Sequence, residues 1–387
     1  MPQPAAAVPV IIDRLDAHVF RAPTPRPVST SFGVMTDRPA VFVRVTDKSG
    51  AYGWGEIFAN WPAAGAEHRA RLLMEDISDL VLGAAVEQPS DLFYRLEKAT
   101  HTRALQCGEW GPFRQVIAGL DIALHDLFAR QAGKSMRCFL NPEARTAVPA
   151  YASGIHVRDG AATIPEQRAA GHQNFKVKIG FDRAEDLNGL CSSAATLLPG
   201  EKLLCDANQA WTLPEAIDFV GAAGDIGLGW LEEAIGADAP AEDWRRLAEV
   251  SSIPLSGGEN IAGFDDFDAA ISAGSLSVIQ PDIMKWGGFT GCVKVSEQTI
   301  RAGRLLCPHF LGGGIGLVAS AHMLAAVGGD GLLEVDANIN PLRDDFAAAG
   351  ARIRDGEFHI HEGIGLGIDT LPESLEPLRT LSLTRHL

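Results

Sequence analysis

The stretch that decides the fold begins Phe175-Lys176-Val177-Lys178 and continues with Leu203-Leu204-Cys205-Asp206 and Trp230-Leu231-Glu232. Four more short apolar runs follow it, and they reach ionisable residues at Glu259, Asp282, His309 and Glu334. The seven terminal ionisable residues lie 23 to 28 positions apart, about the length of one β-strand plus one α-helix. One further step back reaches Val148-Pro149-Ala150-Tyr151-Ala152-Ser153, which makes eight strands.

The segments between these runs have helical spacing, for example Phe267, Ala270 and Ile271, stopped by Gly274. Eight β-α repeats predict a parallel α/β barrel, whose active site lies at the carboxyl ends of the strands. A purely structural sheet would carry Val, Ile and Leu to its strand ends, with Ser, Asp or Asn as helix caps. Seven successive ionisable ends are hard to explain by capping, so they indicate a functional site.

The residues before the barrel predict a small α+β unit. Val41 to Thr46 and Ala51 to Ile57 are separated by Ser49-Gly50 and predict a hairpin. Apolar residues at helical spacing from Ala70 to Val81 predict one helix, and a second begins at Pro112.

Composition excludes several classes of protein. The 387 residues carry 33 Lys+Arg against 49 Asp+Glu, a net charge of −16, so we expect neither nucleic acid nor an anionic membrane as a partner. No window approaches 18 apolar residues, and the amino terminus lacks the basic start of a secretory signal, which favours a cytoplasmic protein. Six scattered cysteines fit a reducing compartment better than disulfides or a zinc site.

Three carboxylates stand on consecutive strands: Asp206 in Cys-Asp-Ala-Asn, Glu232 in Trp-Leu-Glu-Glu and Glu259 in Gly-Gly-Glu-Asn. With these motifs the chain resembles the enolase superfamily, in its mandelate racemase subgroup. The resemblance covers nearly the whole length and implies a modified TIM barrel, (β/α)7β, over residues 146–355. It also implies an α+β capping domain over residues 1–145, completed by residues 356–387.

The resemblance implies that Asp206, Glu232 and Glu259 bind one Mg²⁺ per subunit. Carboxylates without Cys or His are hard oxygen donors of the kind Mg²⁺ prefers. Glu233 is a second candidate beside Glu232, but side chains alternate along a strand, so we expect only one of the two to face the interior. The family pattern favours Glu232.

The residues that would move protons lie on other strands. Lys176 and Lys178 are two positions apart and point to the same side. The resemblance assigns the base to Lys178, while Lys176 would lower the pKa of Lys178 and help to bind the substrate carboxylate. Asp282 and His309 match the His-Asp dyad of the mandelate racemase subgroup, in which the acid orients the imidazole.

Further residues complete the predicted site. Glu334 matches the residue that donates a hydrogen bond to the developing enediolate, and Asp336 is either a substrate contact or a cap. We assign Asn208 and Trp61 to substrate binding. Gly312-Gly313-Gly314 would let the backbone approach a ligand at the start of the next helix.

Specificity is expected from two cap loops, Pro23 to Pro39 and Phe58 to His68, with Phe58, Asn60, Trp61 and His68 as candidate pocket residues. Arg26 or Arg38 could pair with a second substrate carboxylate, although a solvated arginine is the expected state of either.

The resemblance implies abstraction of a proton next to a carboxylate, through an enediolate. The leading hypothesis is an acid-sugar dehydratase, a hydro-lyase that converts an aldonate or aldarate such as galactarate to a 2-keto-3-deoxy acid. The alternative is an isomerase that racemises or epimerises a 2-hydroxy acid. A non-catalytic sugar-acid-binding barrel would have no need for two bases. Family analogy suggests a homo-oligomer, a dimer or an octamer.

Overall fold

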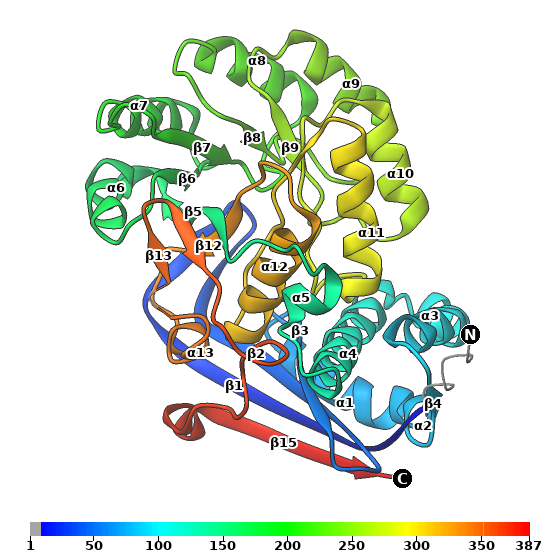
Figure 1. Ribbon diagram of the computed structural model, residues 1–387. Coiled ribbons are helices and arrows are strands. Elements are labelled where there is room, and N and C mark those ends of the chain that lie inside the picture. Colours follow the sequence, from blue (N-terminus) through cyan, green and yellow to red (C-terminus); the bar gives the residue numbers. More distant parts are fainter. Residues whose placement is uncertain (1–8, 351) are drawn as a thin grey trace.

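The computed structural model describes residues 9–350 and 352–387. Eight strands form the predicted barrel: β5 (Ala147–His156), β6 (Asn174–Lys178), β7 (Lys202–Asp206), β8 (Leu231–Glu232), β9 (Leu255–Gly257), β10 (Val278–Ile279), β11 (Leu305–Leu306) and β12 (Leu333–Asp336). Neighbours from β5 to β11 pair in parallel, and β12 returns to pair with β5 (Figure 1). Gly331 brings β12 against β11, because a Cβ there would lie 1.7 Å from the Leu306 carbonyl oxygen.

Seven helices connect these strands: α6 (Gly160–Ala169), α7 (Arg183–Ala194), α8 (Leu213–Ala223), α9 (Ala241–Val250), α10 (Phe264–Ala273), α11 (Gly288–Arg301) and α12 (Gly314–Val327). This alternation confirms the predicted (β/α)7β order. Local sequence fixes the helix ends. Asp182 accepts N–H groups at the start of α7, and Gly274 ends α10 in the left-handed conformation.

The cap is a sheet with helices on one side. Its strands are β1 (Val10–Thr30), β2 (Gly33–Asp47), β3 (Tyr52–Ile57), β4 (Ala85–Val86) and β15 (Arg379–His386), in the order β15-β1-β2-β3 with β4 beside β1. Its helices are α1 (Gly65–Leu72), the π-helical turn η1 (Leu73–Ile77), α2 (Ser78–Val81), α3 (Pro89–Cys107) and α4 (Trp110–Gln131). Gly53 and Gly55 let α4 lie directly on β3, because a Cβ at either would approach an α4 carbonyl oxygen to 2.1 Å.

The C-terminal tail of the chain contributes strands to both the cap and the barrel. Strand β15 pairs with β1 of the cap, as predicted for the end of the chain. In contrast, β13 (Ile353–Arg354) and β14 (Glu357–His359) form a hairpin, and β14 pairs with β5 of the barrel. The stretch around residue 357 therefore belongs with the barrel sheet and not with the cap, because its backbone hydrogen bonds go to β5. The short elements η2 (Val157–Asp159), α5 (Met136–Leu140), α13 (Pro341–Asp344) and η3 (Glu373–Leu378) complete the fold.

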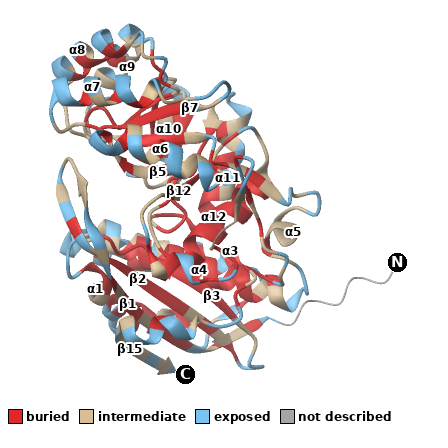
Figure 2. Ribbon diagram, turned by 90° about the vertical axis from the view of Figure 1, so that its left-hand side faces the viewer, coloured by how far each residue is buried: buried red, intermediate tan, exposed pale blue. Residues whose placement is uncertain are grey.

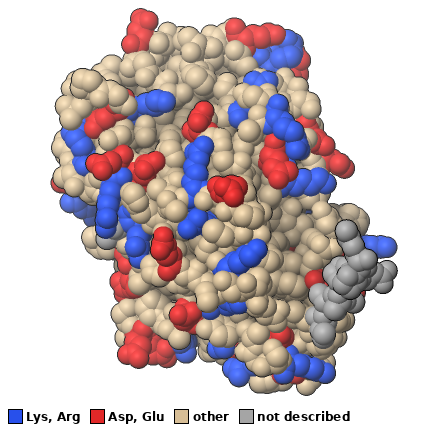
Figure 3. Space-filling model, viewed as in Figure 1, with Lys and Arg blue, Asp and Glu red and all other residues tan. Residues whose placement is uncertain are grey.

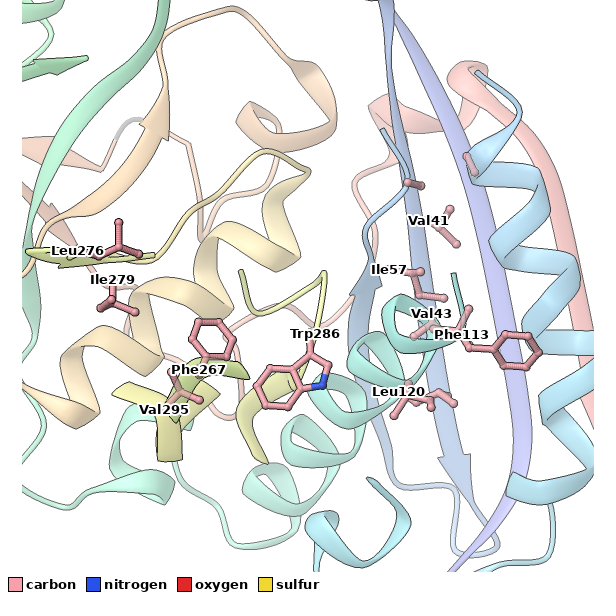
Figure 4. Packing of buried hydrophobic residues seen from close by; sticks show 14 of the residues in the cluster. Val41, Val43, Ile57, Phe113, Leu120, Phe267, Leu276, Ile279, Trp286 and Val295 are labelled. Carbon is pink, nitrogen blue, oxygen red and sulfur yellow. The ribbon is translucent and has the colours of Figure 1, made fainter. Parts of the chain in front are cut away.

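Cap and barrel share one apolar core. A single buried cluster includes Val41, Ile57 and Leu120 of the cap and continues through Trp286 to Ile279 of the barrel (Figure 4). Helix α12 lies between the two parts and is buried along almost its whole length, whereas α7, α8 and α9 expose their outer faces (Figure 2). The barrel mouth and the cap are thus held in fixed relation.

Acidic and basic side chains are interspersed over the face seen in Figure 3. Among the described residues, no helix is both long and apolar enough to cross a membrane.

Candidate active site

A cavity of about 560 Å³ opens between the barrel mouth and the cap. We call its ionisable barrel residues the charged floor: Lys178, Glu233, Glu259, Lys285, His309, Glu334 and Asp336. We call its apolar cap residues the apolar wall: Val28, Phe32, Met35, Phe58, Trp61 and Pro62. Four of the seven predicted strand-end residues thus line one cavity. The other three do not line the cavity: Asp206 pairs with Lys178 and Asp282 with His309, whereas Glu232 pairs with the buried Lys176.

Lys178, Asp206 and Glu232 end three neighbouring strands in register. The ammonium group of Lys178 forms an ion pair with Oδ2 of Asp206. Burial lowers the pKa of Lys178, but the carboxylates of Asp206, Glu232 and Glu334 together outweigh it, so the pKa lies above its ordinary value. Lys176 lowers the pKa of Lys178 as expected, but the neighbouring carboxylates outweigh this effect.

Lys176 is fully buried beneath the floor and does not line the cavity. Its Nζ lies 2.8 Å from both carboxylate oxygens of Glu232 and 2.7 Å from Oε1 of Glu334, and it faces the Tyr151 ring at 5.2 Å. We predicted that Lys176 contacts the substrate carboxylate directly, and this prediction does not agree with its buried position. The positive charge of Lys176 compensates the two buried carboxylates of Glu232 and Glu334.

Glu232 and Glu233 are both buried, at 1% and 2% exposure, so the expectation that only one faces the interior is wrong. Strand β8 ends at Glu232, and a φ of +40° at Glu233 turns the chain and directs its side chain into the cavity. Glu233 accepts a hydrogen bond from Asn260 at 2.7 Å, whereas Glu232 accepts one from Gln280 at 2.6 Å.

The predicted metal ligands are each paired with a lysine. Besides the Asp206–Lys178 and Glu232–Lys176 pairs, Glu259 Oε2 lies 2.9 Å from Lys285 Nζ. As the side chains stand, no three His, Cys, Asp or Glu residues of the described chain are grouped as a ready-made metal cage.

The charges nevertheless suit a divalent cation. Burial and Asp206 raise the pKa of Glu232 to about 7, and burial, Glu259 and Asp206 raise that of Glu233 to about 8. These shifts show crowded carboxylates whose repulsion a bound cation would relieve, and all the donors are oxygens of the type that Mg²⁺ takes. The residues present therefore fit a magnesium ion.

His309 and Asp282 form the predicted dyad. Nδ1 of His309 lies 2.7 Å from Oδ2 of Asp282, whose Oδ1 accepts the N–H groups of Met284 at 2.8 Å and Lys285 at 3.1 Å. Burial lowers the pKa of His309, but Glu259 and Asp282 raise it to about 9. The imidazole is therefore held in one orientation and is protonated at neutral pH, with Nε2 3.4 Å from Glu259.

Glu334 is an acceptor in this structure. Ser153 donates its hydroxyl to Oε1 at 2.5 Å, and the Phe310 N–H binds Oε2 at 3.1 Å. Burial raises the pKa of Glu334, but Lys176 and His309 lower it to about 2. The predicted hydrogen-bond donation to an enediolate needs a protonated carboxyl, so it does not fit this environment.

Three of the four candidate pocket residues of the cap loops, Phe58, Asn60 and Trp61, line the cavity. The rings of Trp61 and Phe32 meet edge-on, with their centroids 5.7 Å apart. His68 does not line the cavity, because it turns away to Glu109 at 3.2 Å.

The two candidate arginines lie in different positions relative to the cavity. Arg26 does not line the cavity. Arg38 lines it, but the expectation of a solvated side chain is wrong, because Arg38 is 3% exposed and pairs with Asp336 at 2.5 Å. Asp336 also accepts the backbone N–H of Asn338 at 3.0 Å and its side-chain amide at 2.7 Å, so it caps the loop after β12, which is one of the two roles expected for it.

Asn208 lines the cavity in a left-handed backbone conformation, with φ of +45°. Its amide Nδ2 donates to Asp206 at 3.1 Å, and its Oδ1 is buried without a hydrogen-bond partner among the described residues. An unsatisfied buried acceptor of this kind favours a ligand contact.

Three contributors were not predicted from the sequence: Lys285, Gln280 and Ser153. Glu233 was considered only as an alternative to Glu232. Gln280 lies two positions before Asp282, and Ser153 ends the extrapolated first strand, so strand spacing carried a signal for both. Lys285 stands in a turn, where alternation gives no direction. The +40° φ that reorients Glu233 has no sequence signature of its own.

The fold and the site together define a capped (β/α)7β barrel whose mouth brings a lysine and a histidine beside a cluster of carboxylates. The chain belongs to the mandelate racemase/muconate lactonizing enzyme family. The N-terminal domain model of that family matches residues 14–140, and the enolase C-terminal domain-like model matches residues 159–374.

Solved structures and curated relatives agree with this family. A mandelate racemase/muconate lactonizing enzyme from Bordetella bronchiseptica is 44% identical, with a TM-score of 0.88 over 94% of this chain and 97% of that one. The D-galactarolactone cycloisomerase of Agrobacterium fabrum is 28% identical over 88% of this chain and 92% of its own. The L-talarate/galactarate dehydratase of Salmonella typhimurium, liganded with Mg and L-lyxarohydroxamate, is 25% identical, with a TM-score of 0.86 over 100% and 97% of the two chains. The homologues therefore include dehydratases, cycloisomerases and racemases.

Proposed function

We propose that the protein is an acid-sugar dehydratase that removes the α-proton of an aldonate or aldarate, such as galactarate, and expels a β-hydroxyl group. The observation that carries this proposal is the placement of Lys178 and His309 in one cavity. Strands β6 and β11 are separated by β5 and β12 on one side and by four strands on the other. The two groups can therefore approach a substrate from different sides of the barrel mouth.

Asp206, Glu232 and Glu259 would hold one Mg²⁺ per subunit. When bound, the ion supplies positive charge that stabilises the second negative charge developing on the substrate carboxylate. Each of these carboxylates is paired with a lysine in the structure, so ligation requires these ion pairs to loosen. Lys178 would then lose its partner Asp206 and become available as a base.

Lys178, once neutral, takes the α-proton, and the electron pair of the C–H bond enters the enediolate. The Cβ–O bond then breaks, and His309 donates its Nε2 proton to the departing hydroxide, which leaves as water. The enol product tautomerises to a 2-keto-3-deoxy acid. The raised pKa of His309 suits this step, because a general acid must carry its proton at the working pH.

The remaining residues have supporting roles. Lys176 adds positive charge beneath the substrate carboxylate, and Glu334 and Glu232 hold its ammonium group in place. Asn208 and Trp61 contact the substrate from the two sides of the cavity, a small-molecule carboxylate being the only partner this site requires. We expect a homo-oligomer.

A second candidate is an isomerase that racemises or epimerises a 2-hydroxy acid through the same enediolate. The apolar wall favours it, because an acid sugar offers hydroxyl groups along its whole length, whereas six apolar side chains suit a less polar substituent. The same proton-transfer groups serve both reactions.

A library of aldonates, aldarates and 2-hydroxy acids, incubated with the protein and Mg²⁺ in D₂O, distinguishes the candidates by product mass. A dehydratase gives a 2-keto acid lighter by one water. An isomerase gives a deuterated product without loss of water. Omission of Mg²⁺ or addition of a chelator should abolish either reaction. Exchange of the α-hydrogen with no keto product for any acid sugar would refute dehydration.

A further inference from the structure

A cap carboxylate that plays no part in these steps holds the chain that follows His309. Glu56, on β3, is 1% exposed. Its Oε1 accepts the N–H of Gly313 at 2.5 Å, and its Oε2 accepts the N–H of Gly316 at 2.8 Å. These groups lie at the start of α12, only four and seven residues beyond His309.

The segment 310–313 between His309 and α12 is neither helix nor strand. A side chain from another element holds each of its residues: Phe310 by Glu334, Leu311 by Asn60, Gly312 by Asn340 and Gly313 by Glu56. Two of these four anchors, Asn60 and Glu56, come from the cap. The position of the segment therefore depends on the cap as well as on the barrel.

The glycines of this segment allow the close contact. A Cβ on Gly312 would lie 2.9 Å from Oε1 of Glu56 and 2.6 Å from Cε of Met284. Met284 belongs to the turn whose N–H binds Asp282, so the segment is pressed between the cap and the acid of the dyad. The prediction that Gly312 to Gly314 admit a ligand is not supported, because Glu56 occupies the N–H of Gly313 and a Cβ on any of the three would lie within 3.0 Å of a neighbouring side chain.

We propose that Glu56 is a positioning residue through which the cap fixes the place of His309 in the active site. This inference rests on the proposed function in one respect, that His309 acts on the substrate. Burial raises the pKa of Glu56 to about 7, although the N–H groups of Gly316 and Gly313 oppose this shift. A carboxylate whose two oxygens each accept a backbone N–H at a helix start is a directional anchor. Its loss should disturb the His309 side of the cavity and leave Lys178, on β6, in place.

Glu56→Gln tests the proposal, because glutamine keeps the shape and loses the charge and one acceptor. Asp126→Asn is the matched control. Asp126, on α4 of the cap, is also fully buried and accepts two backbone N–H groups, from Trp54 at 2.8 Å and Leu366 at 2.6 Å, but these lie outside the His309 segment. Asp126 also binds the Arg130 guanidinium, with Oδ2 2.8 Å from Nε, so Asp126→Asn should lose at least as much stability as Glu56→Gln and is a stringent control for a general structural effect.

The first readout is hydrogen–deuterium exchange of the full chain, followed by peptide mass spectrometry. We expect peptides covering residues 309–317 to exchange about tenfold faster in Glu56→Gln and at the wild-type rate in Asp126→Asn. Unchanged exchange of this segment in Glu56→Gln would overturn the proposal.

The second readout compares 2-keto acid formation, which needs His309 as the acid, with exchange of the α-hydrogen in D₂O, which needs Lys178 as the base. We expect Glu56→Gln to lower 2-keto acid formation about tenfold more than it lowers exchange. An equal loss of both, or the same change of their ratio in Asp126→Asn, would show a general structural effect and overturn the proposal. If the wild-type protein exchanges no α-hydrogen at all, the proposed function fails, and the first readout still decides whether Glu56 anchors the segment.

Discussion

The charged floor and the apolar wall of the cavity are built in different ways. Floor residues are fixed by their neighbours: Asp282 binds His309 and two backbone N–H groups, and Glu334 binds Lys176, Ser153 and a backbone N–H. The wall residues Phe32 and Trp61 contact each other through their rings, and Phe32 is 60% exposed. The difference indicates that the barrel sets the chemistry and the cap sets the substrate.

The largest expected effect is on the floor. Lys178→Ala and His309→Asn should each lower turnover by about 10³-fold or more, because each removes a proton-transfer group, while the midpoint of thermal unfolding stays near that of wild type. The measurement is 2-keto acid formation and α-hydrogen exchange in D₂O. A non-catalytic binding barrel would show no exchange to lose, and variants that keep exchange within threefold of wild type would contradict the assignment of the bases.

The ion pair between Arg38 of the cap and Asp336 of the floor should make a large contribution to the free energy of unfolding. Arg38→Met leaves Asp336 buried without its closest cation and should lower the free energy of unfolding by about 3 to 5 kcal/mol. Urea denaturation measures this loss. The double variant Arg38→Met with Asp336→Leu should recover most of it, because no buried charge is left unpaired. A double variant no more stable than Arg38→Met would contradict this account of the pair.

Asp282→Asn should have a smaller effect, with a specific pH signature. Asp282 contributes to the raised pKa of His309, so wild-type dehydration should persist as pH rises and fall only through about pH 9, where the imidazole loses its proton. Asparagine still accepts the two N–H groups but lacks the charge. We expect a rate about 10²-fold lower and an alkaline limb moved to lower pH. An unmoved limb in the pH–rate profile would remove Asp282 from the tuning of His309.

The sequence predicts the floor better than the wall for a physical reason. Strand spacing and alternation place Lys178, Asp206 and Glu232 in register, and the structure pairs them as expected. Lys176 obeys the same alternation, yet its burial depends on Glu232 and Glu334, which are far away in the chain. The spacing of residues along a strand predicts which side a side chain faces, but it does not predict how deeply that side chain is buried.

The cap shows more clearly what residue spacing cannot predict. The hairpin of β2 and β3 and the helices α1 and α4 follow from local pattern. In contrast, the turn of His68 toward Glu109 and the burial of Arg38 against Asp336 depend on partners that sequence spacing does not reveal. The C-terminal tail, which we predicted to belong to the cap, is likewise divided between the cap and the barrel. The pairing of β14 with β5 depends on where the edge of the barrel sheet lies.

The smallest expected effect is on the wall. Trp61→Ala should raise KM several-fold and leave kcat within about threefold of wild type, because a wall contact is made equally in the bound substrate and in the transition state. Phe32→Ala, at the exposed neighbour of Trp61, is the matched control and should change KM less. Steady-state kinetics on the substrate found in the library measure both constants. A fall in kcat as large as that of Asp282→Asn would place Trp61 in the chemistry, and the division between a catalytic floor and a selective wall would no longer hold.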